Sequence, residues 1–278
     1  MGDPATLQSF IEWSIANYPA RHYALVLWDH GSGWRERNAP TSMKAICFDD
    51  QAGDSLTMTE VRSALNAANA TTGETLDIIG FDACLMQMVE VVYQVMGSAD
   101  RPLVDIAVGS EETEPGDGWD YAATLTALTG NPAMTPAALA TQIVNDYISS
   151  YDPTWDITQS AAQLNLVDEL ATVIDSFAQA MTSATGDWGA IGTARSQAQE
   201  YYYDYYIDLY HFAQLVNQDT SISQAVRDAA SSVMTAVSNA VIAEGHTSSV
   251  ANSHGLSIYY PETATDYFSD YETSLLFT

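Results

Sequence analysis

Positive charge is scarce in this chain. It has 8 Lys and Arg residues against 36 Asp and Glu residues, a formal net charge of −28 over 278 residues. Such a surface repels nucleic-acid phosphates and anionic lipids, so we expect binding to neither nucleic acid nor membrane. The same charge favours solubility in an extracellular medium, and it attracts calcium or peptides that carry Arg and Lys.

Several catalytic motifs are also missing. The only lysine, Lys44, lies between Met43 and Ala45, so the chain has no Gly-Lys-Ser/Thr phosphate loop. It has no His-Glu-x-x-His, Cys-x-x-Cys, EF-hand or Gly-x-Ser-x-Gly pattern, and no apolar run near the roughly 20 residues of a membrane span. Cys47 and Cys84 are too few for a disulfide scaffold, although one bridge and two free thiols both remain open. We expect no required cofactor.

The first half of the chain alternates between strand and helix patterns. The expected helices cover residues 6–17, 59–70 and 85–96, and the expected strands cover 22–28, 45–48, 76–81 and 103–108. Alternation of this kind predicts an α/β fold with a mostly parallel sheet and helices on both faces.

The second half is mainly helical. Its expected helices cover residues 136–149, 167–181, 188–202, 209–216 and 222–243, and a strand near 255–260 follows. We place a boundary near Gly130-Asn131-Pro132, which divides the chain into a core at 1–130 and a largely helical region at 131–278.

Two side chains with catalytic potential follow buried strands. His30 follows the strand ALVLWD, and Cys84 follows DIIGFDA. The carboxyl ends of neighbouring parallel strands meet at one edge of a sheet, so an imidazole and a thiol are expected together there. Cys84 would also begin a helix, whose dipole and free N–H groups lower the pKa of a cysteine. Those N–H groups, with that of Gly31, form an expected oxyanion hole.

The segments LWDHGSGW and GFDACLMQMVEV resemble the His-Gly and Asp-Ala-Cys blocks of clostripain-like cysteine peptidases, which are relatives of caspases, legumains and gingipains. The segments SEETEPGDGWDY, DLYHFAQLV and HGLSIYYP resemble further blocks of that family. The resemblance implies a caspase-like fold and an endopeptidase in which Cys84 attacks the carbonyl and His30 protonates the leaving amine. It also implies cleavage after Arg or Lys.

The resemblance assigns Asp82 to the S1 pocket, which receives the basic P1 side chain. Strand geometry agrees, because residues two apart face the same side, and Asp82 lies two residues before Cys84. Glu111, Glu112 and Asp117 lie in the acidic loop after the next strand, and we expect a second S1 acid among them, with Glu112 and Asp117 as the candidates. The same loop is a candidate calcium site.

Processing and location are further expectations. Relatives often cut themselves at a basic residue between the His and Cys blocks, and Lys44 is the expected site because Arg62 falls in a helix and Arg35 and Arg37 lie close to His30. The family has further strands before the His-bearing strand, which this chain lacks. We therefore expect a secreted or cell-surface peptidase, acting as a monomer on peptides, with its targeting signal outside the chain.

Other interpretations of the same residues stay open. Cys84 can be a small buried hydrophobic residue, as we expect for Cys47, and His30 can be a turn histidine bonded to the backbone. Asp82 can be a helix-capping carboxylate. Lys44 can be a solvated lysine in a surface loop. At the level of the protein, the alternative functions are an inactive caspase-like module for binding or surface display and a metal-dependent hydrolase that uses the many carboxylates.

Overall fold

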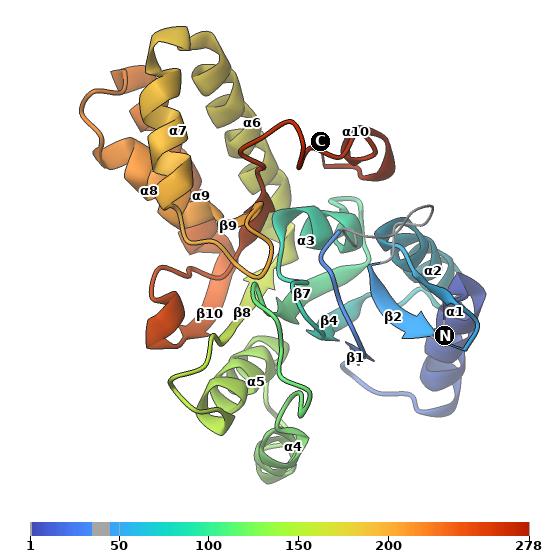
Figure 1. The fold of residues 1–278 in the computed structure, drawn as a ribbon. Helices are drawn as coiled ribbons and strands as arrows, with labels where there is room; N and C mark the ends of the chain where they lie inside the picture. Colours follow the sequence, from blue (N-terminus) through green and yellow to red (C-terminus); the bar gives the residue numbers. More distant parts are fainter. Residues whose placement is uncertain (1, 35–44, 50, 278) are drawn as a thin grey trace.

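A five-stranded sheet forms the centre of the molecule (Figure 1). The computed structural model describes residues 2–34, 45–49 and 51–277. Within them the strand order is β1-β4-β7-β8-β10, with bounds Ala24–Trp28, Leu76–Asp82, Val104–Gly109, Thr158–Gln163 and Val241–His246.

Strand direction confirms the expected fold class. β1 pairs with β4, and β4 with β7, in parallel. β8 is antiparallel to both β7 and β10, so it alone runs against the other four strands. The sheet is therefore mixed and mainly parallel, as the alternating pattern predicts.

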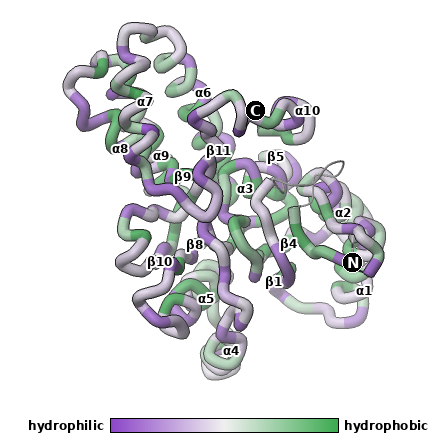
Figure 2. Tube along the Cα trace, viewed as in Figure 1, coloured by the Kyte–Doolittle hydropathy of each residue, from purple (hydrophilic) through white to green (hydrophobic). Residues whose placement is uncertain are grey.

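Helices cover both faces of this sheet. Alternate strand residues belong to two separate cores: Ile79 and Ala107 pack on one side, and Ile78 and Ile106 on the other. The first side meets α1 (Pro4–Asn17), α2 (Met58–Thr72) and α3 (Val89–Val95), and the second meets α5 (Pro136–Ser150). Hydrophobic stretches accordingly run through α3 and the central strands beside it (Figure 2).

The later part of the chain adds a helical unit beside β8 and β10. It contains α6 (Val167–Ser183), α7 (Trp188–Gln197), α8 (Leu209–Gln218) and α9 (Gln224–Ala240). A small antiparallel sheet of β9 (Tyr206–Asp208) and β11 (Ser257–Tyr259) joins this unit to the core. The remaining elements are β2 (Ile46–Asp49), β3 (Asp54–Leu56), β5 (Gly97–Ser98), β6 (Arg101–Pro102), α4 (Tyr121–Gly130), α10 (Tyr271–Ser274) and three short 3-10 turns at Leu164–Leu166, Thr185–Asp187 and Ser248–Val250.

Most expected elements are present, with informative exceptions. The expected helix 59–70 is α2, which begins after Thr57, and Thr57 forms a capping box with Glu60. The expected helix 222–243 instead ends at Ala240, where the chain turns into β10, and α7 ends at Gln197 rather than 202. β8 and α4 were not expected at all. The short sequence TQSAAQ of β8 has a single β-branched residue, Thr158, and otherwise small or polar side chains that give little strand signal.

The boundary near residue 130 does not divide the sheet. β8 and β10 come from the second half of the chain and complete the sheet begun by β1, β4 and β7. The expected strand near 255–260 exists as β11, but it belongs to the small sheet. Among the described residues no helix is long and apolar enough to span a membrane. Lys44, Arg35 and Arg37 lie outside the described residues, whereas Arg62 lies within α2, as expected.

Candidate active site

Strand register brings His30 and Cys84 to the same edge of the sheet. Trp28 at the end of β1 lies opposite Asp82 at the end of β4. His30 and Cys84 each follow two residues later, and the Asp29 N–H still bonds the Asp82 carbonyl at 3.4 Å. The pairing that the sequence predicts for these strand ends is therefore present.

Gly31 fits closely against the turn that carries Cys84. A Cβ at this position would lie 2.4 Å from the Cys84 carbonyl oxygen and 3.0 Å from the Ala83 side chain. Any larger residue would push the two turns apart, which explains a glycine directly after His30. The His30 side chain is exposed, and its ring meets Phe48 edge to face with centroids 6.1 Å apart.

The expectation that Cys84 begins a helix is wrong. α3 starts only at Val89, and Leu85 has a left-handed φ of 64° that a helix does not allow. The turn after β4 bonds instead to the loop after β7, through Leu85 N–H to the Glu112 carbonyl at 3.1 Å. The turn is buried and therefore rich in apolar residues. Their spacing resembles the apolar face of an amphipathic helix, which explains the wrong expectation.

The Cys84 thiol therefore lacks the helix dipole that we expected to act on it. Burial raises its pKa above the ordinary value, a backbone hydrogen bond lowers it, and the negative charge of Glu114 raises it again. The bond in question runs from the Glu114 N–H to Sγ at 3.2 Å, and the thiol donates in turn to the Glu114 carbonyl at 3.7 Å. The thiol is half-buried, and the raised pKa favours its protonated form.

Asp82 lies beneath this edge, and Glu114 lies beside it. The Asp82 side chain is only 3% exposed; its Oδ2 accepts the Tyr121 hydroxyl at 2.6 Å, and its buried Oδ1 has no partner among the described residues. Burial first, and then the negative charge of Asp82 and a hydrogen bond to it, hold the pKa of Glu114 well above its ordinary value. A protonated Glu114 can donate to Asp82, which satisfies two oxygens that otherwise lack hydrogens.

Aromatic side chains wall this carboxyl pair. The Trp119 indole N–H donates to Glu114 Oε1 at 3.4 Å, and the Trp119 and Tyr121 rings lie 6.3 Å apart. The Tyr151 hydroxyl donates to the Gly118 carbonyl at 2.6 Å and so fixes the loop that carries Glu114. The Asp82 and Glu114 carboxyl groups therefore lie among aromatic side chains close to the turn that carries Cys84.

The loop after β7 is fixed to β8. The backbone N–H groups of Glu111 and Glu112 both donate to the Thr158 hydroxyl, at 3.0 and 3.1 Å. Glu111 accepts the Gly255 N–H, and Glu112 accepts the Tyr202 N–H at 3.1 Å, so both carboxylates have partners away from Asp82. Asp117 is exposed. Glu114, which the sequence argument passed over within the same loop, is the acid beside Asp82.

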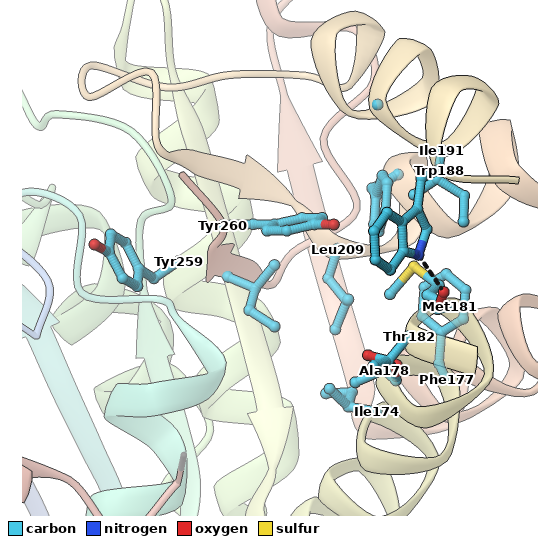
Figure 3. A pocket seen from close by; sticks show the side chains of 13 residues that line it. Ile174, Phe177, Ala178, Met181, Thr182, Trp188, Ile191, Leu209, Tyr259 and Tyr260 are labelled. Carbon is cyan, nitrogen blue, oxygen red and sulfur yellow. Dashed lines mark hydrogen bonds between the residues drawn. The ribbon is translucent and has the colours of Figure 1, made fainter. Parts of the chain in front are cut away.

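Two other features lie apart from this site. Among the described residues, no group of three or more His, Cys, Asp and Glu side chains is arranged to hold a metal ion. An apolar cavity of about 450 Å³ lies between α6, α7, α8 and β11, with Trp188 and Tyr260 in its wall (Figure 3). None of the candidate catalytic or pocket residues lines it.

Comparison with known proteins gives a consistent result. The profile of the Clostripain family matches residues 1–278. Clostripain from Hathewaya histolytica is 36% identical over 127 residues, which is 44% of this chain and 23% of clostripain. That match therefore spans less than a quarter of the relative's length.

Solved structures show the same architecture. A secreted cysteine protease from Bacteroides thetaiotaomicron, in complex with an irreversible peptide inhibitor, has a TM-score of 0.69 at 22% identity, over 98% of this chain and 74% of that one. An inactive zymogen protease from Parabacteroides distasonis has a TM-score of 0.71 at 21% identity, over 99% and 75%. At these identities the likeness is one of fold, and it confirms the caspase-like class.

Proposed function

The chain belongs to the Clostripain family, and from this premise we propose that it is a cysteine endopeptidase that cleaves peptide bonds after Arg or Lys. One observation carries the proposal. The register of β1 and β4 brings His30 and Cys84 to adjacent turns above the buried carboxylate of Asp82. Nucleophile, proton carrier and specificity pocket thus occupy one edge of the sheet.

In the proposed reaction, Cys84 Sγ attacks the scissile carbonyl while His30 removes the thiol proton. The N–H groups of Gly31 and Cys84 hold the oxyanion. His30 then passes the proton to the leaving amine as the C–N bond breaks, which leaves a thioester on Cys84. Water, deprotonated by His30, hydrolyses the thioester and restores the thiol.

His30 acts as a general base in this scheme rather than as the cation of a stable ion pair. Burial keeps the thiol pKa high, so the free enzyme holds a neutral thiol instead of a ready thiolate. The proton must leave during attack, and the turn after β1 is where a base is present. This differs from the helix-activated thiolate that the sequence suggested.

Specificity follows from the Asp82 and Glu114 carboxyl groups. A basic P1 side chain supplies the N–H donors that Asp82 Oδ1 lacks, and its charge offsets a buried carboxylate. We assign the second pocket acid to Glu114 because its side chain is next to Asp82. We further propose secretion, since a relative of the same fold is a secreted protease and the net charge of −28 suits an extracellular medium.

The test is covalent labelling followed by turnover. A peptide with arginine at P1 and a thiol-reactive group should modify Cys84 and not Cys47, as located by mass spectrometry. Peptides with Arg, Lys, Gln or Glu at P1 should then be cleaved in that order of preference. A folded chain that takes no label and cleaves none of these peptides is the inactive binding module instead.

A further inference from the structure

The surroundings of Asp82 and Glu114 contain an unusual number of buried polar atoms without partners. Among the described residues these are Asp82 Oδ1, Glu114 Oε2, both amide atoms of Gln159 and the hydroxyl of Tyr147. Asp82, Gln159 and Tyr147 are 3%, 1% and 0% exposed. Native proteins keep only a few such groups per hundred residues, and here several gather around one pocket.

These groups come from separate elements that converge on the pocket. Asp82 ends β4, Tyr147 lies in α5, and Gln159 lies in β8. Burial first, and then neighbouring groups that include Glu114, Cys84 and Asp82, raise the pKa of Tyr147, and Gln159 acts on the pKa of Glu114. Several buried polar atoms of these elements thus lack a hydrogen bond among the described residues.

Charge in the pocket is uncompensated. The titratable groups that interact with Glu114 are Asp82 and Cys84 at the end of β4, Tyr121 of α4, Tyr147 of α5 and Tyr151 just after α5. None of these groups is a cation. Burial and the nearby charge of Asp82 therefore both favour the protonated form of Glu114.

We propose that the Asp82–Glu114 pair exchanges a proton for the basic side chain of the substrate. In the empty enzyme Glu114 carries the proton and donates it to Asp82. When an Arg or Lys side chain enters, the O–H bond of Glu114 breaks and the proton passes to solvent, so the cation faces two carboxylates. This inference rests on the proposed function, because it assigns a proton balance to the same P1 pocket.

Proton release makes affinity depend on pH in a defined way. Burial, the largest cause, raises the pKa of Glu114, which favours the protonated form that the proposal assigns to the free enzyme. Binding of a basic peptide should then tighten by up to about tenfold per pH unit until Glu114 ionises in the free enzyme. A peptide with a neutral P1 residue releases no proton from this pair, and its affinity gains nothing from the same rise in pH.

Calorimetry measures the exchange directly. Cys84→Ala protein is titrated with a peptide that has arginine at P1, in two buffers of the same pH but different ionisation enthalpy. The difference in heat gives the number of protons released, which we expect to be about one. The same peptide with citrulline at P1, which has the shape of arginine without its charge, should release none.

Two variants on the Cys84→Ala background identify the group. Glu114→Gln keeps the volume and can donate to Asp82 but cannot ionise, so proton release should disappear. Glu90→Gln is the matched control: Glu90 is a fully buried glutamate in α3 with a pKa raised to about 7, and it contacts Tyr259 and Tyr271 instead of the pocket. This control should still release one proton.

The outcomes separate the two proposals. Tight binding of the arginine peptide with no proton release, or with equal release in Glu114→Gln, overturns the exchange and leaves the peptidase proposal standing. Failure of the arginine peptide to bind overturns both. If Glu114→Gln does not fold, the slope of log affinity against pH in the Cys84→Ala protein decides instead, because a flat slope is incompatible with exchange.

Discussion

The two cysteines of the chain lie in contrasting surroundings. Cys47 lies in β2, outside the five-stranded sheet, and is 2% exposed. Cys84 is half-buried at the carboxyl end of β4, next to the His30 turn, and its sulfur bonds the Glu114 backbone. Burial raises the pKa of both thiols, that of Cys47 to about 11. The pKa direction therefore does not distinguish the two thiols, and the proposal that Cys84 is the nucleophile rests on its position at the strand ends.

Replacing each cysteine in turn should give the largest contrast. Cys84→Ala should lower turnover of an arginine peptide by about 10⁴-fold or more, because the bond-forming atom is lost. Cys47→Ala should stay within about twofold in kcat and lose about 1 kcal/mol of stability through lost packing. Peptide hydrolysis and urea unfolding measure the two effects. Near-wild-type turnover in a folded Cys84→Ala protein would contradict the proposed role of Cys84 as the nucleophile.

The histidine of the same edge should give the next effect. His30→Ala should lower kcat by about 10²- to 10⁴-fold, because the side chain proposed to carry the thiol proton is lost. His22 precedes β1 in the sequence, whereas His30 follows it. The His22 side chain is exposed, and its Nδ1 lies 2.7 Å from Asp77 Oδ1, so His22→Ala is the control and should keep full turnover. Equal losses in the two variants would mean that His30 has only a structural role.

The pocket acid should affect selectivity more than rate. Asp82→Asn should lower kcat/KM for arginine peptides by about 10²-fold while leaving peptides with a neutral P1 residue nearly unchanged. Asp117→Asn changes an exposed carboxylate of the neighbouring loop and should keep the preference. An enzyme that prefers acidic or apolar P1 residues would contradict the role of Asp82 without touching that of Cys84.

The contact between the two turns should give the smallest of these effects. Gly31→Ala places a methyl group where Cys84 O lies 2.4 Å away, so the turns must separate, and we expect a loss of about tenfold in kcat. Gly189→Ala in α7 meets nothing within 4 Å and should leave kcat unchanged. Steady-state kinetics with the melting temperatures of both variants would separate a local shift from unfolding.

The sequence predicts the frame of the site well. His30 and Cys84 follow short apolar strands, and the period of those strands is enough to place both residues at one sheet edge. This placement succeeds because it depends on the length and apolar pattern of each strand. That Asp82 faces the same side as Cys84 stays a prediction, because β4 ends at Asp82 and Cys84 lies in the turn that follows.

The details of the pocket depend on contacts between distant segments. The loop after β7 holds the Leu85 backbone in the left-handed conformation. Because this contact joins distant segments, no local sequence pattern shows that the helix begins only at Val89. Glu111, Glu112 and Glu114 are three glutamates of one loop, so the sequence alone does not show which of them faces Asp82. The hydrogen bonds of this loop to Thr158, Tyr202 and Gly255 decide it. β8 was missed for a similar reason, since its small side chains become a strand only between β7 and β10.

The central sheet contains strands from both halves of the chain, so it cannot be completed until late in protein synthesis. The ribosome produces His30, Asp82 and Cys84 long before Gln159 of β8, and later still β10 and Gly255, which anchors Glu111. A nascent chain that ends before β8 has the reacting atoms but neither the far wall of the pocket nor the support of its loop. Cotranslational folding therefore delays assembly of the site until most of the polypeptide has emerged.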